Sequence, residues 1–544
     1  MSQNQATAEA VPHIEMPAKL SAYLPAFFAL LGAILLGLLC MKVGSARFIS
    51  DGALMMLALA CYLTAAVFHL TNLYAPSQMA QKVGLWAASL GVFFNLSSWL
   101  VRWVAAHDRE LAILQNNGYG PEQMPWVWRY IPFANLYDLS LAFAFGAGIT
   151  TLLIAHRKNF RFIGAVSLPL ASLILLLARF IGNEFIDLPP ILDSYWRPIH
   201  VGIASLSYGV ALVCFAVAVV YLLKDGVKTE AMAIWSSIFS FLVIGTVGLV
   251  GALSLGAVLN WSVLTTGTYR AATILAGSNS RRPIPLRVDI PYVGWTFVAA
   301  AVLLIAVVIA FGIYLAKKNE QARIWGHRLL KLSLVMQAAG IALLVSQVKT
   351  LTNLAARIDP RQYGQFGKWL AEQQGATKEQ LAQATPEQFA MIAQDWITDN
   401  GARLSLSLNS NPVELAALIT AFAATLFVII FSFRTEKLRA ALPPLEKLDS
   451  LMYKTASVAF AGLAMLLITG AVWANESWGR YWGWDSKETG ALVAWLTYAA
   501  FLHTRIARGW TGRRSAYFAL VGFLLVIFTY LGVSYLLPGL HSYA

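Results

Sequence analysis

Long apolar runs recur along the chain and alternate with shorter polar stretches. A helix needs about 20 mostly apolar residues to cross roughly 30 Å of hydrocarbon, and each run is close to that length. About thirteen runs lie near residues 22–41, 52–72, 84–105, 136–155, 162–180, 200–223, 231–256, 292–316, 327–348, 413–434, 455–473, 489–507 and 515–537. The pattern predicts an all-α, polytopic membrane bundle of about 13 transmembrane helices.

The first run has no small-residue cleavage site behind it, so we expect a retained span rather than a signal peptide. Basic residues gather in alternate loops, around Arg157, Lys224, Lys317, Arg434 and Arg508. Because basic loops stay in the cytoplasm, this asymmetry predicts an inside N-terminus and an outside C-terminus. The loop at 257–291 runs against that rule, since its arginines would lie outside.

Composition supports the membrane interpretation and excludes other classes. The chain is 58% hydrophobic and 12% charged, far from the values of soluble domains. Its net charge of +13 reflects the inner loops and does not indicate nucleic-acid binding. Cys40, Cys61 and Cys214 all lie in apolar runs without a Cys-x-x-Cys pair, so we expect neither a thiol redox pair nor a disulfide framework.

The polar stretches divide the chain into four parts. A cytoplasmic tail, 1–21, precedes an N-terminal membrane half at 22–225. Residues 226–444 look like an insertion of ordinary spans, in which the hydrophilic segment 350–412 is expected to be mostly helical and outside. That segment is interpreted as a soluble cap or as a docking surface for a partner protein. Residues 445–544 hold three spans and the most unusual loop of the chain.

That loop, 473–488, carries four tryptophans and one tyrosine among several charged residues. Trp478, Trp482 and Trp484 offer apolar faces on which a planar ligand could stack. An aromatic belt at the membrane interface is the alternative. A belt does not explain the Gly-x-x-Trp-x-Trp-Asp order, so a flat, apolar, anionic ligand such as heme is favoured.

Charged residues near the indoles suit the acidic edge of heme. Arg480 and Lys487 in the loop could pair with the two propionates. Arg102 and Arg197, on other outer loops, could do the same. The carboxylates of Asp485 and Glu488 cannot pair with propionates, and we expect them to hold Arg480 or Lys487 or to accept bonds from indole N–H groups.

Two histidines are expected on the same outer side as this loop. His200 opens the sixth run, and His541 follows the last one. Neutral imidazoles are strong axial ligands of heme iron, and two of them make a six-coordinate site. An interfacial histidine without a ligand role is the alternative for each.

Two further histidines lie deeper. His503 is about fourteen residues into the twelfth run, roughly 20 Å from its outer end at a rise of 1.5 Å per residue, and His69 lies at a similar depth in the second run. An ionisable group inside the membrane is a functional candidate by default. The pair could form a second site, or His69 could be a helix-packing residue.

Four segments together resemble one family. The segment 478–488, Trp-Gly-Arg-Tyr-Trp-Gly-Trp-Asp-Ser-Lys-Glu, is similar to the WWD signature of heme-handling proteins in cytochrome c biogenesis. The segments 132–138, 196–201 and 539–543 narrow the resemblance to the CcsA (ResC) family of system II. The resemblance covers about 84–225 and 445–544. Asp138 and Ser486 depart from the family pattern, which usually has Glu and Pro there.

The resemblance implies a function and its residues. Proteins of this family deliver heme across or at the outer face of the bacterial inner membrane, where it is attached to an apocytochrome c. By this resemblance His200 and His541 are the outer axial ligands of heme b, so with His503 they make up the predicted iron ligands. His503 is one in-membrane ligand, and the other usually comes from a CcsB (ResB) partner. The chain would then be a component of a cytochrome c synthase, or heme lyase, working with a thiol-reducing, thioredoxin-like protein.

Two other functions fit parts of the pattern. A membrane transporter with an aromatic external site would explain the tryptophans without heme. A membrane electron carrier with heme b would use paired histidines such as His69 and His503, but it leaves the tryptophan loop unexplained.

Overall fold

The computed structural model describes residues 23–120, 131–185, 190–245, 269–275, 284–406 and 412–533. Within these ranges, 11 helices are long and apolar enough to cross a membrane, which confirms an α-helical, multi-pass membrane protein. Helices α7 (Thr229–Val243) and α17 (Ser486–Arg508) lie at the two other predicted positions. The former is described over 15 residues only, and the total of thirteen spans stays a prediction.

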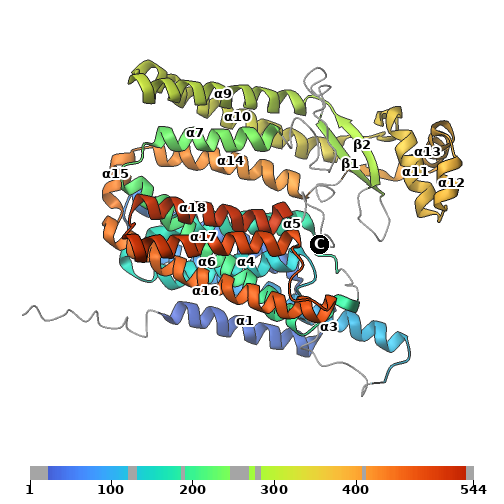
Figure 1. The fold of residues 1–544 in the computed structure, drawn as a ribbon, viewed down its shortest axis with the longest axis horizontal. Helices are drawn as coiled ribbons and strands as arrows, with labels where there is room; N and C mark the ends of the chain where they lie inside the picture. The colour runs from blue at the N-terminus through green and yellow to red at the C-terminus, as the bar shows by residue number, and fades with distance from the viewer. Residues whose placement is uncertain are drawn as a thin grey trace, which may run out of the picture.

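The main bundle is built from both ends of the chain and shares one apolar core. Its helices are α1 (Leu24–Val43), α2 (Asp51–Tyr74), α3 (Gln78–Asn116), α4 (Leu136–Ala155), α5 (Gly164–Ile181), α6 (Trp196–Lys224), α16 (Leu445–Trp478), α17 and α18 (Arg513–Ile527). In Figure 1, α16, α17 and α18 lie beside α4 and α6, although more than 200 residues separate them in sequence.

Local sequence signals set where these helices begin and end. The side chain of Ser50 caps α2 by accepting a hydrogen bond from the Ala53 amide, and Asn135 caps α4 through the Asp138 amide. Such caps satisfy amides that have no partner inside the helix. Gly509 follows α17 with φ of 62°, a left-handed conformation that glycine adopts without steric cost.

The insert bundle consists of α7, α9 (Val293–Lys317), α10 (Glu320–Thr350) and α14 (Pro412–Ser432), and it packs along one side of the main bundle (Figure 1). Helix α14 contacts α5, and α15 (Thr435–Ala441) contacts α2. Inside it, Ser240, Gln337 and Thr425 hydrogen-bond across three helices. Such bonds commonly join helices where both water and a hydrophobic driving force are missing.

The cap is a small unit at one end of the insert bundle (Figure 1). Strands β1 (Tyr269–Leu275), β2 (Ile284–Ile290) and β3 (Leu404–Leu406) form an antiparallel sheet in the order β2-β1-β3. Helices α11 (Tyr363–Gln373), α12 (Lys378–Gln383) and α13 (Pro386–Asn400) complete it. The sequence predicted the helical part of this segment, but the sheet was not expected.

The main bundle has two unlike ends. At the basic end, which contains residues 156–158, 225–228 and 509–512, the carboxylate of Asp449 pairs with the Arg505 guanidinium and accepts a bond from the Gly512 amide. At the tryptophan end, which contains residues 182–185, 190–195 and 479–485, a cavity opens between the helices. The cap lies at the same end of the molecule as the C-terminal end of α16 (Figure 1).

Candidate functional site

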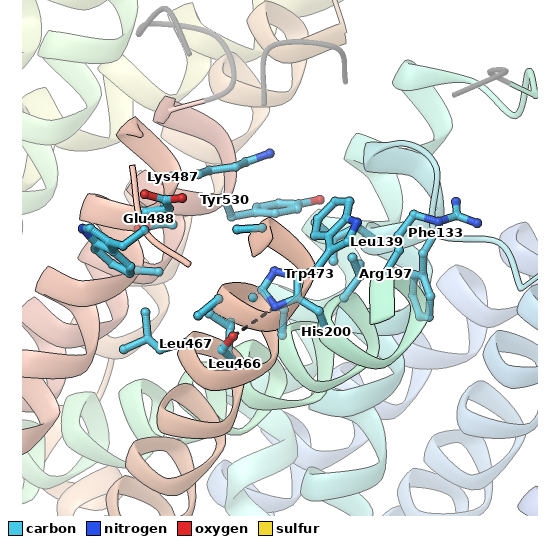
Figure 2. A pocket seen from close by; sticks show the side chains of 18 of the residues that line it. Phe133, Leu139, Arg197, His200, Leu466, Leu467, Trp473, Lys487, Glu488 and Tyr530 are labelled. Atoms are coloured by element: carbon cyan, nitrogen blue, oxygen red, sulfur yellow. Dashed lines mark hydrogen bonds between the residues drawn. The ribbon is translucent and has the colours of Figure 1, made fainter. Parts of the chain in front are cut away.

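A cavity at the tryptophan end brings together segments from both ends of the chain. Its empty volume is about 940 Å³, including space open to solvent. Its lining includes Phe133, Arg197, His200, Tyr208, Leu466, Gly470, Trp473, Trp478, Trp482, Lys487, Glu488 and Tyr530. Most of the lining is apolar, with its charged groups at the edge (Figure 2).

His200 lies in the first turns of α6 with its ring against α16. Its Nδ1 atom is 3.0 Å from the carbonyl oxygen of Leu466, as the dashed line in Figure 2 marks, and 3.4 Å from Thr469 Oγ1. Because a carbonyl only accepts, Nδ1 carries the proton in this bond and the lone pair lies on Nε2. This is the tautomer that a metal ligand needs, and a carbonyl partner on the other nitrogen is the usual means of fixing it.

Aromatic rings from three helices surround His200. Trp473 has its ring centroid 5.7 Å from that of His200 and 6.1 Å from that of Trp478. Tyr530 lies in a π-helical segment, Phe528–Gly532, and its centroid is 6.4 Å from that of Tyr208. Single π-helical turns occur often at functional sites. The rings form apolar walls that suit a flat, apolar ligand.

The tryptophan loop is held by the start of α17. The Glu488 carboxylate accepts hydrogen bonds from the amides of Gly483 and Asp485, at 2.8 and 3.1 Å, and the Asp485 carboxylate accepts one from the Lys487 amide at 3.0 Å. This capping box gives both carboxylates a structural role. These bonds come from backbone amides, and the bonds to cationic side chains or indoles stay a prediction.

The predicted loop residues divide into two groups. Trp478, Trp482, Lys487 and Glu488 line the cavity. Trp484 instead is 72% exposed, and its ring makes a T-shaped contact with Trp482, with centroids 5.7 Å apart. Arg480 is also exposed and lies across Gly483.

Two cations remain at the edge of the cavity. Burial lowers the pKa of Lys487 to about 8, although the neighbouring Asp485 carboxylate opposes this shift. Lys487 lies in the first turn of α17, ahead of its apolar stretch. Arg197 is buried and its guanidinium is 4.0 Å from the Asp193 carboxylate. The cavity therefore combines apolar walls with a positive edge.

Arg102, a further candidate for the acidic edge of a ligand, lies outside the cavity lining. It is 1% exposed and pairs with the carboxylates of Asp51 and Asp138. Its guanidinium also donates to the Asn183 carbonyl at 2.8 Å, and the Tyr137 hydroxyl donates to Asp51 at 3.0 Å. This network ties the starts of α2 and α4 to α3, and Asp138 is part of it rather than of a ligand site.

The other candidate histidines lie apart from His200. His503 is exposed on α17, toward the basic end. His69 is 2% exposed and packs against Gly84 and Gly164, and its Nε2 atom has no hydrogen-bond partner among the described residues. These two glycines lie on α3 and α5, and the packing on them favours the helix-packing interpretation. His541 lies outside the described residues.

Several cavity residues were not predicted. Tyr208 and Tyr530 lie inside apolar runs, where aromatic residues are too common to indicate a site. Gly470 is different, because glycine inside a helix is unfavourable by roughly 1 kcal/mol relative to alanine. A glycine within an apolar helical run therefore indicates a close approach, and this signal could have identified Gly470.

The sequence comparisons match the part of the chain that builds the cavity. Residues 133–271 and 413–541 match the family model described as cytochrome C assembly protein, and every residue that lines the cavity falls in these segments. The chain is thus a multi-pass membrane protein with two segments that are similar to the cytochrome c assembly family. The interruption, 272–412, is shorter than the expected insertion 226–444, because α7 and α14 belong to the matched segments.

Similarity to individual proteins narrows this class. Over 98 residues the chain is 58% identical to the "Cytochrome c biogenesis protein CcsA" of Synechococcus sp. (strain CC9902), covering 18% of this chain and 32% of that relative. It is 57% identical over 99 residues to the protein of the same name from Guillardia theta, covering 18% of this chain and 33% of that one. The matches confirm the predicted resemblance to CcsA-type cytochrome c biogenesis proteins, and they span about a third of the length of these relatives.

Proposed function

We propose that this protein binds heme b at the tryptophan end and presents it to an apocytochrome c for covalent attachment. The observation that carries the proposal is His200, whose Nδ1 is engaged by the Leu466 carbonyl inside a cavity walled by tryptophans and tyrosines. Heme is a flat, apolar macrocycle with two carboxylates on one edge, and apolar walls with Lys487 and Arg197 at the edge fit that shape and charge.

The chain's own residues would position the cargo. His200 would hold the iron through Nε2, and the resemblance assigns the opposite ligand to His541. Trp473, Trp478 and Trp482 would fix the ring plane and exclude water. In the attachment, two cysteine thiols of the apocytochrome add across the heme vinyl groups, so the reacting atoms belong to the two substrates. The chain would contribute orientation, which lowers the entropic part of a barrier.

His503 would serve a second heme position within the membrane. It lies on a stripe of α17 with the exposed apolar residues Val493, Leu496 and Ile506, which are 41%, 49% and 74% exposed. A charged or polar group on such a face is costly unless another helix meets it. The resemblance names a CcsB-like membrane protein as the source of that helix and of the second histidine, with a thioredoxin-like protein keeping the apocytochrome thiols reduced.

The topology completes the proposal. The tryptophan end would face the periplasm of a bacterial inner membrane, and the basic end would face the cytoplasm, as the basic loops predict. The proposed domain division keeps 22–225 and 445–544 as the heme-handling parts. Residues 226–444 would be the insertion, although α7 and α14 near its ends also match the assembly family, and 350–412 would be its outside cap.

The proposal is tested by the heme content of the purified protein, measured as a pyridine hemochrome, in the wild type and in the variants His200→Ala and His541→Ala. We expect bound heme with a low-spin spectrum in the wild type and a loss of that spectrum in both variants. His107→Ala, a histidine bonded to Asp108 outside the cavity, is the matched control and should bind as the wild type does. Unchanged heme in both ligand variants would refute the assignment.

A further inference from the structure

One glycine of α16 shapes the place where the His200 ring lies. A side chain carbon added at Gly470 would meet the His200 ring at 2.7 Å from Cε1, 3.0 Å from Nδ1 and 3.5 Å from Nε2. Real Cβ atoms essentially never come within 3.0 Å of a neighbouring atom. Only a residue without a side chain therefore leaves room for the ring in this position.

Space, and not backbone conformation, is the reason for glycine here. Gly470 lies inside α16 with a helical neighbour on each side, and its φ is not positive. Glycine in a helix interior is unfavourable by roughly 1 kcal/mol relative to alanine, so alanine would stabilise α16 itself. The ring that the glycine admits is held one turn away by the Leu466 carbonyl, four residues earlier on the same helix.

The two contacts act on the same ring from the same helix. The Leu466 carbonyl fixes the proton on Nδ1, and the missing side chain at Gly470 lets the imidazole approach closely enough for that bond of 3.0 Å. A methyl group at position 470 would push Cε1 and Nδ1 away from α16. The bond would lengthen, and Nε2 would change its direction in the cavity.

We propose that Gly470 is a positioning residue that sets the orientation and tautomer of His200 toward heme iron. The inference rests on the proposed heme site. It adds Gly470 to that site as a residue that does not itself bind the ligand. Removing a partner that orients a metal-ligating histidine typically costs about 10- to 100-fold in affinity, and we expect a loss of heme affinity of that size for Gly470→Ala.

Gly462→Ala is the matched control. Gly462 lies two turns earlier on α16, and a side chain there would also collide with α6, with Ser207 Cβ at 3.0 Å and the Ser207 hydroxyl closer still. Ser207 does not line the cavity. The two variants therefore disturb the same helix pair with the same methyl group, but only one of them touches His200.

The test is a heme titration of detergent-purified wild type, His200→Ala, Gly470→Ala and Gly462→Ala, followed by absorption spectra. We expect Gly470→Ala to lose low-spin heme as His200→Ala does, and Gly462→Ala to keep it. Wild-type binding by Gly470→Ala, or an equal loss in Gly462→Ala, overturns the inference while the His200 assignment stands. No heme in the wild type, or no effect of His200→Ala, overturns the proposed function instead.

A measurement made without heme separates the orientation of the His200 ring from the binding of heme. Carbethoxylation of His200, followed by mass spectrometry of its peptide, should be faster in Gly470→Ala because the ring is displaced from Leu466. An unchanged rate contradicts the inference.

A second pair of variants applies if Gly470→Ala fails to fold. The double variant His200→Gly/Gly470→Ala removes the collision with the ring. Added imidazole should then restore low-spin heme in the single variant His200→Gly but not in the double variant. Equal rescue in both variants would contradict a role for Gly470.

Discussion

Each end of the main bundle holds a histidine packed on glycine, and the two environments differ. At the tryptophan end, the His200 ring lies on Gly470, and it lines a cavity with its Nδ1 bonded to a carbonyl. Toward the basic end, His69 is enclosed by Gly84 and Gly164 and is 2% exposed. Histidine and glycine therefore do not define a ligand site by themselves. The His200 environment differs from that of His69 because its ring is oriented by a carbonyl and lies beside space that a ligand can occupy.

Crowding the His69 ring is expected to cause the largest loss of stability. In Gly164→Ala, a new carbon would lie 2.9 Å from His69 Nε2 and closer to its Cδ2. Overpacking of a core typically destabilises by about 1–3 kcal/mol, and we expect a loss near 3 kcal/mol with no change in the heme spectrum. The loss of stability is measured by unfolding the protein in mixed detergent micelles. The double variant His69→Ala/Gly164→Ala should recover most of the loss, and a failure to recover would show that His69 is not the residue crowded.

The aromatic wall at the tryptophan end gives the next largest effect. Trp482 lines the cavity, and an indole buries about 150–250 Å² with a preference for stacked contacts. We expect Trp482→Ala to weaken heme binding by about 2 kcal/mol, roughly 30-fold, while thermal stability changes little. Heme titration followed by absorbance checks this. An unaltered affinity would place the ligand away from this wall.

A smaller effect is expected from the cation at the cavity edge. The pKa of Lys487 is lowered to about 8 by burial, so its amine is charged at pH 7 and loses its charge as the pH rises through 8. Affinity for a carboxylate-bearing ligand should therefore be highest below pH 8 and fall above it. Lys487→Gln should bind about tenfold more weakly at pH 7, the loss of one charged contact, and show no such fall.

The charge of Lys487 affects the stability of the heme-free protein in the opposite direction from its effect on heme binding. Because the pKa of Lys487 in the folded protein lies below that of the unfolded chain, keeping the charge buried disfavours the heme-free fold at pH 7. The heme-free Lys487→Gln protein should therefore be at least as stable as the wild type at pH 7, and the difference should shrink as the pH approaches 10. A less stable Lys487→Gln variant at pH 7 would show that the amine has a structural partner.

The smallest effect is expected two residues from Trp482. Trp484 is 72% exposed and is not part of the cavity lining, so Trp484→Ala should change heme affinity by less than about 0.5 kcal/mol, the usual range for exposed positions. The same titration compares it with Trp482→Ala. Equal losses in the two variants would mean that the loop acts as a unit rather than through the ring that faces inward.

The sequence predicted the helices of the main bundle well because apolar runs of membrane length have few alternatives. It also predicted His200, Trp478, Trp482 and Lys487, which the fold brings to one cavity. The sequence did not show that Trp482 lines the cavity while Trp484 does not, because a position on a loop does not reveal where the side chain points. Asp51, the partner of Arg102, was missed because the contact joins residues 51 positions apart on different helices.

Glu488 has a consequence for how the tryptophan loop meets a ligand. Its carboxylate holds the amides on both sides of Trp484, and Trp484 adopts φ of 57°, a left-handed conformation that is unfavourable by about 1–2 kcal/mol for residues other than glycine. The two bonds therefore restrain the backbone of residues 483–485 before any ligand arrives. Fixing a residue's backbone is unfavourable by roughly 1–2 kcal/mol in conformational entropy. Because folding has already ordered these residues, a ligand that stacks on Trp482 loses little affinity to ordering the loop.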